Sequence, residues 1–423
     1  MSTSYPLKTS ENRRYLIDQT GAPFLLQGDA AWSLLVQCSK EDAVMYLEDR
    51  ARRGFNSLLV NLIEHWFASS PPKNVYGDQP FTAKNNFATP NEKYFEHVDW
   101  VIEKAAQYNI QILLAPIYLG AIGGQLGGDH DQGWIDELLA APLGQCIEYG
   151  HFLGERYRNF DNILWVIGGD RDPALSLNRL NIIAEAIKES DKRHLFTAHP
   201  QPEKSTSEQF TGGDWLDINA TYTYEIVHKK LLRDYNHSPT MPTFLVESAY
   251  ENEHNATEVQ IRRQAYWSIL CGGFGHVFGC WPIWGFGSPQ GPKGYPANEW
   301  KNALALPGSV GMTRWGDFFR SRRWYDLKPD QEHAVVTSGL GEFNGLNFVS
   351  AAMSSDRSVT LAYLPSRTTI TVDLTKMSGQ EVAGKWFNPR EGTYSNIGEF
   401  PTNSSTEFTS PTADDWLLVL EIN

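Results

Sequence analysis

Cysteine is scarce in this sequence. The 423 residues include four cysteines, and no two of them form a Cys-x-x-Cys pair. Their neighbours are mostly apolar or belong to helical patterns, so we interpret them as small buried side chains and expect no disulfide framework. The cysteines are Cys38, Cys146, Cys271 and Cys280.

Long hydrophobic runs are also missing. The N-terminal segment MSTSYPLKTSENRRYLIDQTG has no apolar centre of the kind found in signal peptides. No stretch reaches the roughly 20 apolar residues that a membrane-spanning helix needs, so no membrane partner is expected. The sequence predicts a cytoplasmic location if Met1 is native, and a secreted or periplasmic one if the chain has been trimmed.

Positive charge is under-represented, with 36 Lys and Arg against 50 Asp and Glu and a net charge of -14. Proteins that bind nucleic acids need a basic surface, so no nucleic-acid partner is expected. Aromatic residues, in contrast, make up 13% of the chain, including 14 Trp and 18 Tyr. Aromatic rings stack on sugars but also fill protein cores, and composition leaves both interpretations open.

Short apolar runs alternate with amphipathic stretches from Phe24 to about Trp284. Continuous rather than alternating hydrophobicity is typical of parallel strands that are covered on both faces. The runs are FLLQGDAAW (24–32), SLLVNLI (57–63), QILLAPIYL (111–119), ILWVIGGD (163–170), LFTAHP (195–200), DINATYTY (217–224), TFLVESAY (243–250) and GHVFGCWPIW (275–284).

Helical patterns separate these runs. The first is SKEDAVMYLEDRARRG, with Ser39 as the expected N-cap and Gly54 at its end, and the last is MTRWGDFFRSRRWYDL after the eighth run. The helix expected after the fifth run, in QPEKSTSEQF, is poorly marked. Eight βα units predict an α/β fold, a (β/α)8 TIM barrel. A doubly wound open sheet is the alternative, but no G-x-G-x-x-G follows the first run.

The pattern changes near residue 330. The remaining residues form short alternating runs separated by Gly, Asn, Pro and Ser, such as SVTLAYL, TITVDL and WLLVLEI. This pattern predicts a small all-β antiparallel sandwich. We therefore expect a catalytic barrel at 1–330 and a β-sandwich at 331–423.

Two carboxylates stand at the ends of predicted barrel strands. Asp170 follows two glycines in ILWVIGGD, and Glu247 ends the apolar part of TFLVESAY. Strands four and seven face each other across the barrel mouth, where catalytic sites of this fold lie. Two carboxyls roughly 5–5.5 Å apart are what a retaining glycosidase needs. Alternatively, each carboxylate forms a salt bridge with a neighbour such as Arg171.

Other polar and aromatic residues also fall at strand ends and are typical of a sugar-binding site, although several of them could be packing residues. Glu64 and Glu251 are rival carboxylates just beyond their strands. Two loops, 65–89 and 120–139, are long and should shape a cleft at the same face. The expected substrate-binding residues are Asp29, Trp32, Asn61, His65, Tyr118, His199, Tyr222, Tyr224 and Trp284.

Metal chemistry is a competing class of function. Asp129, His130 and Asp131 could ligate a cation, and His199 could join them. However, the sequence has no H-E-x-x-H motif, and histidines do not gather at several strand ends. G-x-S-x-G and P-loop motifs are missing too. We expect neither a metal nor a cofactor.

Several segments resemble the apiosidase-like glycoside hydrolases, glycoside hydrolase family 140. They are LIDQTGAPFLLQGDAAW, RGFNSLLVNL, ILWVIGGDRDP, FLVESAYE and RRQAYWSILCGGFGHVFG. The tail, with SVTLAYLP, KWFNPREGTY and DDWLLVLE, is similar to the β-sandwich that follows such barrels and is often labelled a collagen-binding domain. We interpret this domain as a structural brace, since its sequence shows no collagen-binding feature.

The resemblance implies a retaining mechanism with Asp170 as acid/base and Glu247 as nucleophile. It also implies an oligosaccharide or polysaccharide substrate from plant cell walls, such as apiose linked to galacturonic acid in rhamnogalacturonan II. The alternatives are an endo-acting, cellulase-like glycanase, a non-catalytic carbohydrate-binding barrel and a metal-dependent hydrolase. The two long loops favour a pocket around a terminal sugar.

Overall fold

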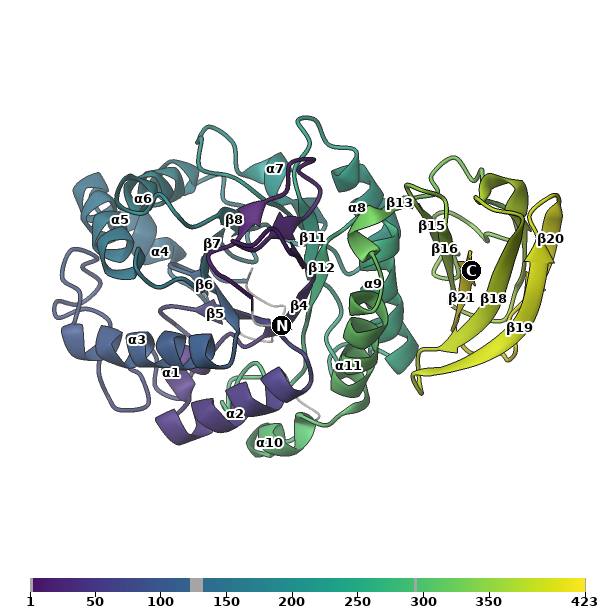
Figure 1. The fold of residues 1–423 in the computed structure, drawn as a ribbon. Coiled ribbons are helices and arrows are strands. Elements are labelled where there is room, and N and C mark those ends of the chain that lie inside the picture. Colours follow the sequence, from purple (N-terminus) through teal and green to yellow (C-terminus); the bar gives the residue numbers. More distant parts are fainter. Residues whose placement is uncertain (1–2, 122–131, 293–294, 423) are drawn as a thin grey trace.

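The computed structural model describes residues 3–121, 132–292 and 295–422. It shows a nearly closed parallel barrel beside a C-terminal domain of antiparallel sheets (Figure 1). The strands pair in the order β8-β7-β6-β5-β4-β12-β11-β10. Their bounds are β4 Leu26–Ala30, β5 Ser57–Asn61, β6 Gln111–Ala115, β7 Ile163–Gly168, β8 Phe196–His199, β10 Asn219–Tyr222, β11 Thr243–Glu247 and β12 Gly275–Phe278.

The last gap of the barrel, between β8 and β10, is bridged by a few hydrogen bonds instead of a regular ladder. The Ile218 amide donates to the Phe196 carbonyl at 3.1 Å, and the Thr197 hydroxyl donates to the Ile218 carbonyl at 2.9 Å. Each predicted apolar run contains one of the barrel strands, so the predicted alternation of strands and helices is confirmed.

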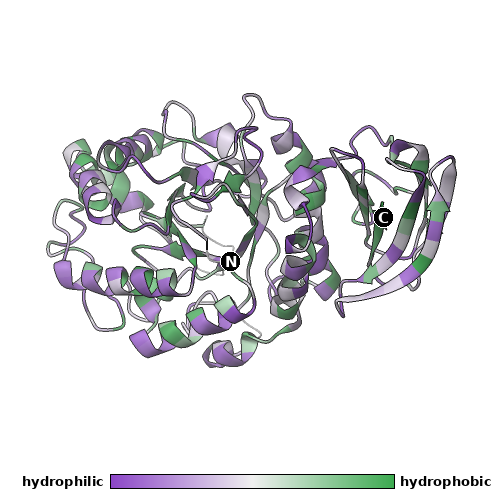
Figure 2. Cartoon of the chain, in the orientation of Figure 1, coloured by the Kyte–Doolittle hydropathy of each residue, from purple (hydrophilic) through white to green (hydrophobic). Residues whose placement is uncertain are grey.

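Barrel strands are buried along their whole length because both of their faces are covered. Every residue of β5, Ser57–Asn61, is buried, and so is every residue of β7. The helices outside them have hydrophilic outer faces, whereas the strands are mostly hydrophobic (Figure 2). This arrangement is what continuous hydrophobic runs require in a parallel sheet.

Helices surround the barrel. Ser39 caps the first long one as expected, since its hydroxyl accepts a hydrogen bond from the Asp42 amide at 3.2 Å. The bounds are α1 Leu34–Gln37, α2 Lys40–Arg52, α3 Glu92–Gln107, α4 Ile135–Ala140, α5 Leu143–Tyr157, α6 Leu177–Ser190, α7 Thr206–Gln209, α8 Val227–Tyr235, α9 Glu258–Leu270, α10 Trp300–Ala303 and α11 Pro307–Arg320.

Two helical elements differ from the sequence expectation. The poorly marked fifth helix is only the short α7, with a Ser205/Glu208 capping box, and the two-residue strand β9, Lys204–Ser205, precedes it. The final helix begins at Pro307, before the predicted Met312, and ends at Arg320. Proline suits the first turn of a helix because it has no amide to leave unpaired.

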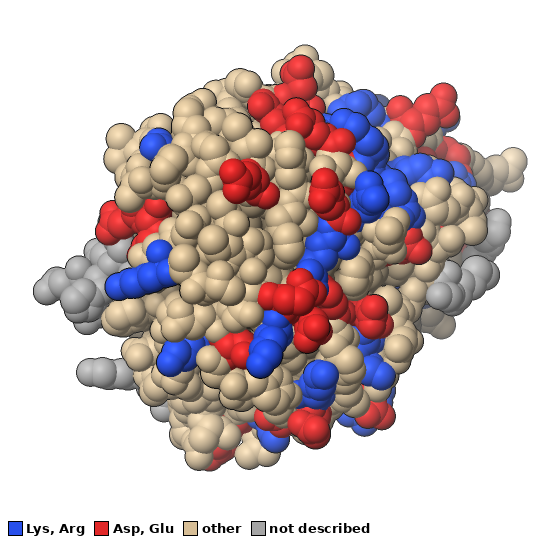
Figure 3. Space-filling model, turned by 90° about the vertical axis from the view of Figure 1, so that its left-hand side faces the viewer, with Lys and Arg blue, Asp and Glu red and all other residues tan. Residues whose placement is uncertain are grey.

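The charged surface of the barrel is mixed in sign. Figure 3 shows the side turned away from the C-terminal domain, where acidic and basic side chains are interspersed. Some of these charges are paired: Arg156 of α5 contacts Glu92 and Asp99 of α3, at 2.7 Å each. The four cysteines are buried and free. Among the described residues, helices that are both long and apolar enough to cross a membrane are not found.

Three further sheets complete the fold. An N-terminal sheet joins β1 Lys8–Thr9, β2 Leu16–Ile17 and β3 Pro23–Phe24. The C-terminal domain has a six-stranded sheet, β13-β15-β16-β21-β18-β19, and a three-stranded sheet, β14-β17-β20. Their bounds are β13 Leu327–Pro329, β14 Val336–Ser338, β15 Ser350–Ser354, β16 Val359–Leu364, β17 Thr369–Asp373, β18 Glu381–Asn388, β19 Thr393–Pro401, β20 Ser405–Thr409 and β21 Trp416–Glu421.

Strand β21 is apolar from residue 416 to residue 420 because its two faces pack in different cores. Leu418 and Leu420 pack inside the C-terminal domain, whereas Leu417 and Val419 pack with the core of the barrel. Alternate side chains of a strand point to opposite faces, so one strand contributes to both cores. The six-stranded sheet thereby attaches the C-terminal domain to the barrel.

A buried ionic network also joins the two domains. The Asp415 carboxylate accepts hydrogen bonds from the guanidinium of Arg262 in α9 at 2.9 Å and from the Tyr363 hydroxyl at 2.9 Å. The ring of Tyr363 stacks on Tyr266 of α9, with centroids 4.9 Å apart. These contacts support the interpretation of the domain as a brace.

Asp415→Ala is expected to lower the free energy of unfolding by about 3–5 kcal/mol, because it leaves the guanidinium of Arg262 without its buried partner. Urea denaturation followed by tryptophan fluorescence measures this change. The matched control is Asp414→Ala at the adjacent position, because the Asp414 side chain is 59% exposed. This substitution should change the free energy of unfolding by less than about 0.5 kcal/mol. Equal effects of the two substitutions would contradict a bracing role for the network.

Candidate active site

Asp170 lies just beyond β7, after two glycines that the local geometry requires. Gly168 has a φ of 89° and Gly169 a φ of 151°, a region that side chains with a Cβ rarely adopt. A Cβ on Gly169 would lie 2.3 Å from a ring carbon of Tyr118. Gly169 therefore allows the Tyr118 ring to approach, and the Tyr118 hydroxyl donates a hydrogen bond to Asp170.

Glu247 is the last residue of β11, and a change of register places two tyrosines beside it. Between Thr221 and Tyr222 the pairing of β10 with β11 shifts, so that Tyr222 lies opposite Glu247. The Tyr222 hydroxyl donates to the Tyr224 hydroxyl at 2.9 Å, which donates to Oε1 of Glu247 at 3.0 Å. One oxygen of the Glu247 carboxylate is thus held by a chain of two phenols.

His199, the last residue of β8, holds the other oxygen of Glu247. Its Nε2 lies 2.8 Å from Glu247 Oε2, and its Nδ1 lies 3.1 Å from the Pro200 carbonyl oxygen. Burial alone would lower the pKa of His199, but the hydrogen bond and charge of Glu247 and the charge of Asp170 outweigh it and raise the pKa. With acceptors at both nitrogens, the ring is best satisfied as an imidazolium that donates twice.

The two carboxyls lie close together. Asp170, His199 and Glu247 each offer one side-chain atom within 4.8 Å of the others. Burial first, and then the charge of Asp170, raises the pKa of Glu247, although the hydrogen bonds from His199 and Tyr224 oppose this shift. Two carboxylates this close repel each other, so the pair favours a state with one proton.

The same three residues have the composition of a three-ligand metal site. A metal-bound histidine must be neutral and point a lone pair at the metal. Both ring nitrogens of His199 instead face oxygen acceptors, so this histidine is arranged as a hydrogen-bond donor. The arrangement fits a carboxylate pair better than a metal centre. Asp129, His130 and Asp131 lie outside the described residues.

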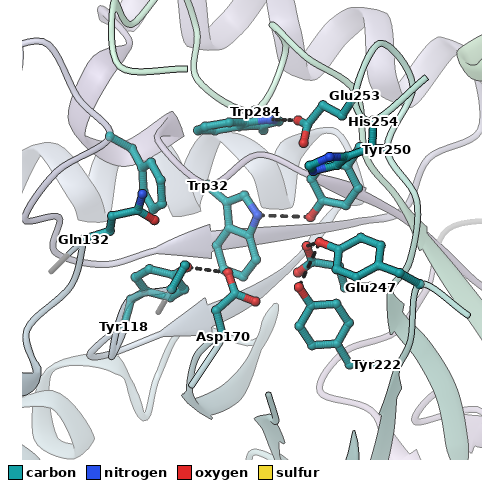
Figure 4. Close-up of a pocket in the computed structure, with 13 residues that line it drawn as sticks. Trp32, Tyr118, Gln132, Asp170, Tyr222, Glu247, Tyr250, Glu253, His254 and Trp284 are labelled. Atoms are coloured by element: carbon teal, nitrogen blue, oxygen red, sulfur yellow. Dashed lines mark hydrogen bonds between the residues drawn. The ribbon is translucent and has the colours of Figure 1, made fainter. Parts of the chain in front are cut away.

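A pocket with aromatic walls surrounds the carboxyl pair (Figure 4). Its empty space is about 500 Å³, part of it open to solvent. The Trp32 indole donates to the Tyr250 hydroxyl at 3.1 Å, which fixes two of the rings. The described lining residues are Trp32, Phe67, Tyr118, Ala121, Gln132, Asp170, Tyr222, Tyr224, Glu247, Tyr250, Glu253, His254 and Trp284.

Most of the residues expected from the sequence gather at this pocket. Asp170, Glu247, Trp32, Tyr118, Tyr222, Tyr224 and Trp284 line it, and His199 lies behind Glu247. Three others lie outside this lining. Asp29 is buried against α2, where Tyr46 donates to it at 2.7 Å and Arg50 pairs with it at 3.3 Å. Asn61 is buried at the end of β5, and His65 bonds Glu137 at 2.9 Å.

The rival carboxylates also lie outside the described pocket lining. Glu64 is buried and accepts a hydrogen bond from the Ser33 hydroxyl at 2.6 Å. Glu251 accepts one from the Gly308 amide at 2.8 Å, which satisfies a free amide in the first turn of α11. Burial raises the pKa of both carboxyls to about 7. These hydrogen bonds indicate a structural role for Glu64 and Glu251.

Several lining residues were not predicted from the sequence, namely Phe67, Ala121, Gln132, Tyr250, Glu253 and His254. Tyr250 could have been predicted, since it is the last residue of the TFLVESAY run that contains Glu247. The others belong to loops, where the direction of a side chain depends on backbone turns that no simple pattern reveals.

Residues 10–326 match the model of the apiosidase-like catalytic domain. The chain belongs to the apiosidase-like glycoside hydrolases. In this hydrolase, residues 329–421 match a second model, described as "Putative collagen-binding domain of a collagenase". The predicted family is thus confirmed. No curated protein matched the sequence.

Solved structures agree with this assignment. One described as a glycoside hydrolase is 26% identical to this hydrolase, with a TM-score of 0.86, over 99% of this chain and 97% of its own. A family 5 glycoside hydrolase from Bacteroides vulgatus is 25% identical, with a TM-score of 0.86, over 98% and 92%. A family 5 mannosidase from Rhizomucor miehei shares the fold, at 14% identity and a TM-score of 0.51, over 74% and 96%.

Proposed function

We propose that this hydrolase cleaves glycosidic bonds with retention of configuration, using Asp170 as acid/base and Glu247 as nucleophile. The observation that carries the proposal is the separation of the two carboxyls, with one oxygen of each within 4.8 Å. Retaining enzymes place these groups roughly 5–5.5 Å apart, whereas inverting enzymes need roughly 6.5–9.5 Å to admit a water molecule between them.

In the first step the Asp170 carboxylic acid protonates the glycosidic oxygen. A Glu247 oxygen attacks the anomeric carbon, the bond to the leaving oxygen breaks, and the leaving group departs as an alcohol. In the second step the Asp170 carboxylate takes a proton from water, whose oxygen attacks the anomeric carbon and releases Glu247. Asp170 is then protonated again and ready for the next cycle.

The neighbours of Glu247 suit the role of a nucleophile. The hydrogen bonds from His199 at 2.8 Å and Tyr224 at 3.0 Å favour its ionised form. These bonds oppose the rise that burial and the charge of Asp170 cause in the pKa of Glu247, and a carboxyl must be ionised to act as a nucleophile. The positive His199 also balances the charge that remains on the pair.

Gly169→Ala is expected to lower kcat/KM by about 100-fold, because the new methyl group would displace Tyr118 and Asp170 by a fraction of an ångström or more. Steady-state kinetics on the best substrate, beside a thermal melt, would show the loss. Gly144→Ala on α5 is the matched control, since a Cβ there meets nothing within 4 Å. An unchanged kcat/KM in Gly169→Ala would show that this turn does not set the position of Asp170.

For the substrate we propose a neutral terminal sugar on a side chain of a plant cell-wall polysaccharide, such as apiose in pectin. Family membership supports the class of substrate, and the pocket supports a terminal sugar over an internal one. Lys and Arg are missing from the described lining residues, so a negatively charged sugar would find neither a Lys nor an Arg among them to pair with its charge. An endo-acting glycanase would need an open groove, and a non-catalytic binding barrel would not need the carboxyl pair.

A panel of aryl glycosides and pectic oligosaccharides tests this proposal. We expect release of a neutral monosaccharide from chain ends, detected by chromatography of the products. Release of internal oligosaccharides would instead support the endo-acting alternative. Binding of a pectic oligosaccharide without any cleavage would support the binding barrel.

A further inference from the structure

A third carboxyl, that of Glu253, lines the pocket in addition to the catalytic pair. It lies with Trp284 on the side of the pocket opposite Asp170 (Figure 4). The Trp284 indole donates a hydrogen bond to Glu253 Oε1 at 2.6 Å. Glu253 takes no part in the proposed reaction of Asp170 and Glu247.

The turn that carries Glu253 has an unusual backbone. Asn252 and His254, on either side of it, have φ values of 67° and 49°, and Asn255 has a φ of 58°. Side chains with a Cβ seldom adopt this region, and such residues persist only where the surrounding structure holds them. The Asn252 side chain donates to the Trp281 carbonyl at 2.8 Å, which anchors the turn to the segment after β12. This turn directs Glu253 into the pocket.

The charges around Glu253 favour its neutral form. Burial and the charges of Glu247 and Asp170 raise its pKa to about 8, although the hydrogen bond from Trp284 lowers it. Since Trp284 donates to Oε1, that oxygen is the acceptor and Oε2 is left to carry the proton. The titratable groups near it are Asp170 after β7, Tyr224, Glu247 of β11, the adjacent His254 and Cys280 after β12.

We propose that Glu253 is a substrate-binding residue, whose protonated carboxyl donates a hydrogen bond to a hydroxyl of the sugar in the pocket. This inference rests on the proposed function, because the sugar is the one that the Asp170–Glu247 pair cleaves. Oε1 is fixed by Trp284, so Oε2–H is presented to the ligand at a set position. A neutral acid in this place recognises a hydroxyl without adding a third negative charge beside the catalytic pair.

Glu253→Gln tests the protonated state, because an amide keeps an acceptor for Trp284 and a donor for the sugar at every pH. In the wild type, kcat/KM should fall as pH rises through about 8, where Glu253 loses its proton. Glu253→Gln should keep kcat/KM within a few-fold of the wild-type value at pH 6. Its kcat/KM should not show the fall near pH 8 that is expected for the wild type. Glu253→Ala should lower kcat/KM by about tenfold or more at pH 6, mainly through KM.

Glu225→Gln is the matched control, since Glu225 is an exposed glutamate whose side chain lies outside the pocket lining. It should change neither kcat/KM nor its pH profile. An activity of Glu253→Gln as low as that of Glu253→Ala would overturn the proposal, because an ionised carboxylate would then be the working form. Equal activity of Glu253→Ala and the wild type would overturn it as well.

A second measurement separates this inference from the proposed function. The NMR signal of the Trp284 indole N–H, assigned with Trp284→Phe, should shift as pH passes through about 8 in the wild type and stay constant in Glu253→Gln. This titration requires no catalysis. A flat signal in the wild type refutes the neutral Glu253, whereas a titrating signal in a protein that cleaves no glycoside refutes only the proposed hydrolysis.

Discussion

Glu247→Gln is expected to lower kcat on every glycoside by about four orders of magnitude, because an amide cannot attack the anomeric carbon. The quality of the leaving group should not matter, since the first covalent step needs this nucleophile for all substrates. The fold should persist, because glutamine can still accept the hydrogen bond from the Tyr224 hydroxyl. Initial rates on an activated aryl glycoside and on a pectic oligosaccharide measure the effect.

Chemical rescue makes this test sharper. In Glu247→Ala, added azide should restore turnover of an activated aryl glycoside and yield a glycosyl azide of inverted configuration, because the small anion attacks where the carboxylate stood. Glu225→Gln, an exposed glutamate outside the pocket, is the control and should retain full activity. Full activity of Glu247→Gln would remove Glu247 from the mechanism.

Asp170→Ala is expected to show a different signature, in which the loss depends on the leaving group. On a natural oligosaccharide, kcat/KM should fall by about 10²–10⁴, because the leaving sugar alcohol needs a proton. On an aryl glycoside with a strongly acidic phenol, kcat/KM should fall by much less, since that phenolate leaves without protonation. The second step still lacks its base, so kcat should stay low and a burst of phenol should precede slow turnover.

Asp172→Asn is the matched control for this prediction. Asp172 lies two residues further along and is exposed, and its side chain accepts a hydrogen bond from the Ala174 amide at 3.0 Å. It should leave both substrates unaffected. A uniform loss on all substrates in Asp170→Ala would assign Asp170 a role in binding or folding instead of proton transfer.

Much of the barrel could be predicted because each of its strands lies within a mostly apolar run of the sequence. A strand such as β7, Ile163–Gly168, is buried along its length, and its hydrophobic run ends where the polar site begins. Residues at the strand ends, such as Tyr118, Asp170 and Glu247, could therefore be assigned to one face from the order of the elements.

The direction of each side chain could not be predicted in the same way. Asp29 lies near the end of barrel strand β4, as Glu247 lies at the end of β11, but Tyr46 and Arg50 of α2 hold it outside the pocket. Tyr46 and Arg50 belong to a helix whose position in the chain could be predicted from the sequence. The rotation of that helix about its own axis, which decides where these side chains point, could not. Glu253 was missed for the opposite reason, since residues with positive φ on both sides of it turn a loop side chain inward.

The stereochemistry of the product tests the central claim most directly. Proton NMR of the reaction, recorded within the first turnovers on the best substrate of the panel, distinguishes the two anomers of the released sugar before they equilibrate. Two carboxyls with oxygens within 4.8 Å predict that the first sugar released has the anomeric configuration of the substrate. Initial release of the opposite anomer would show that water attacks directly, and would contradict the assignment of Glu247 as nucleophile.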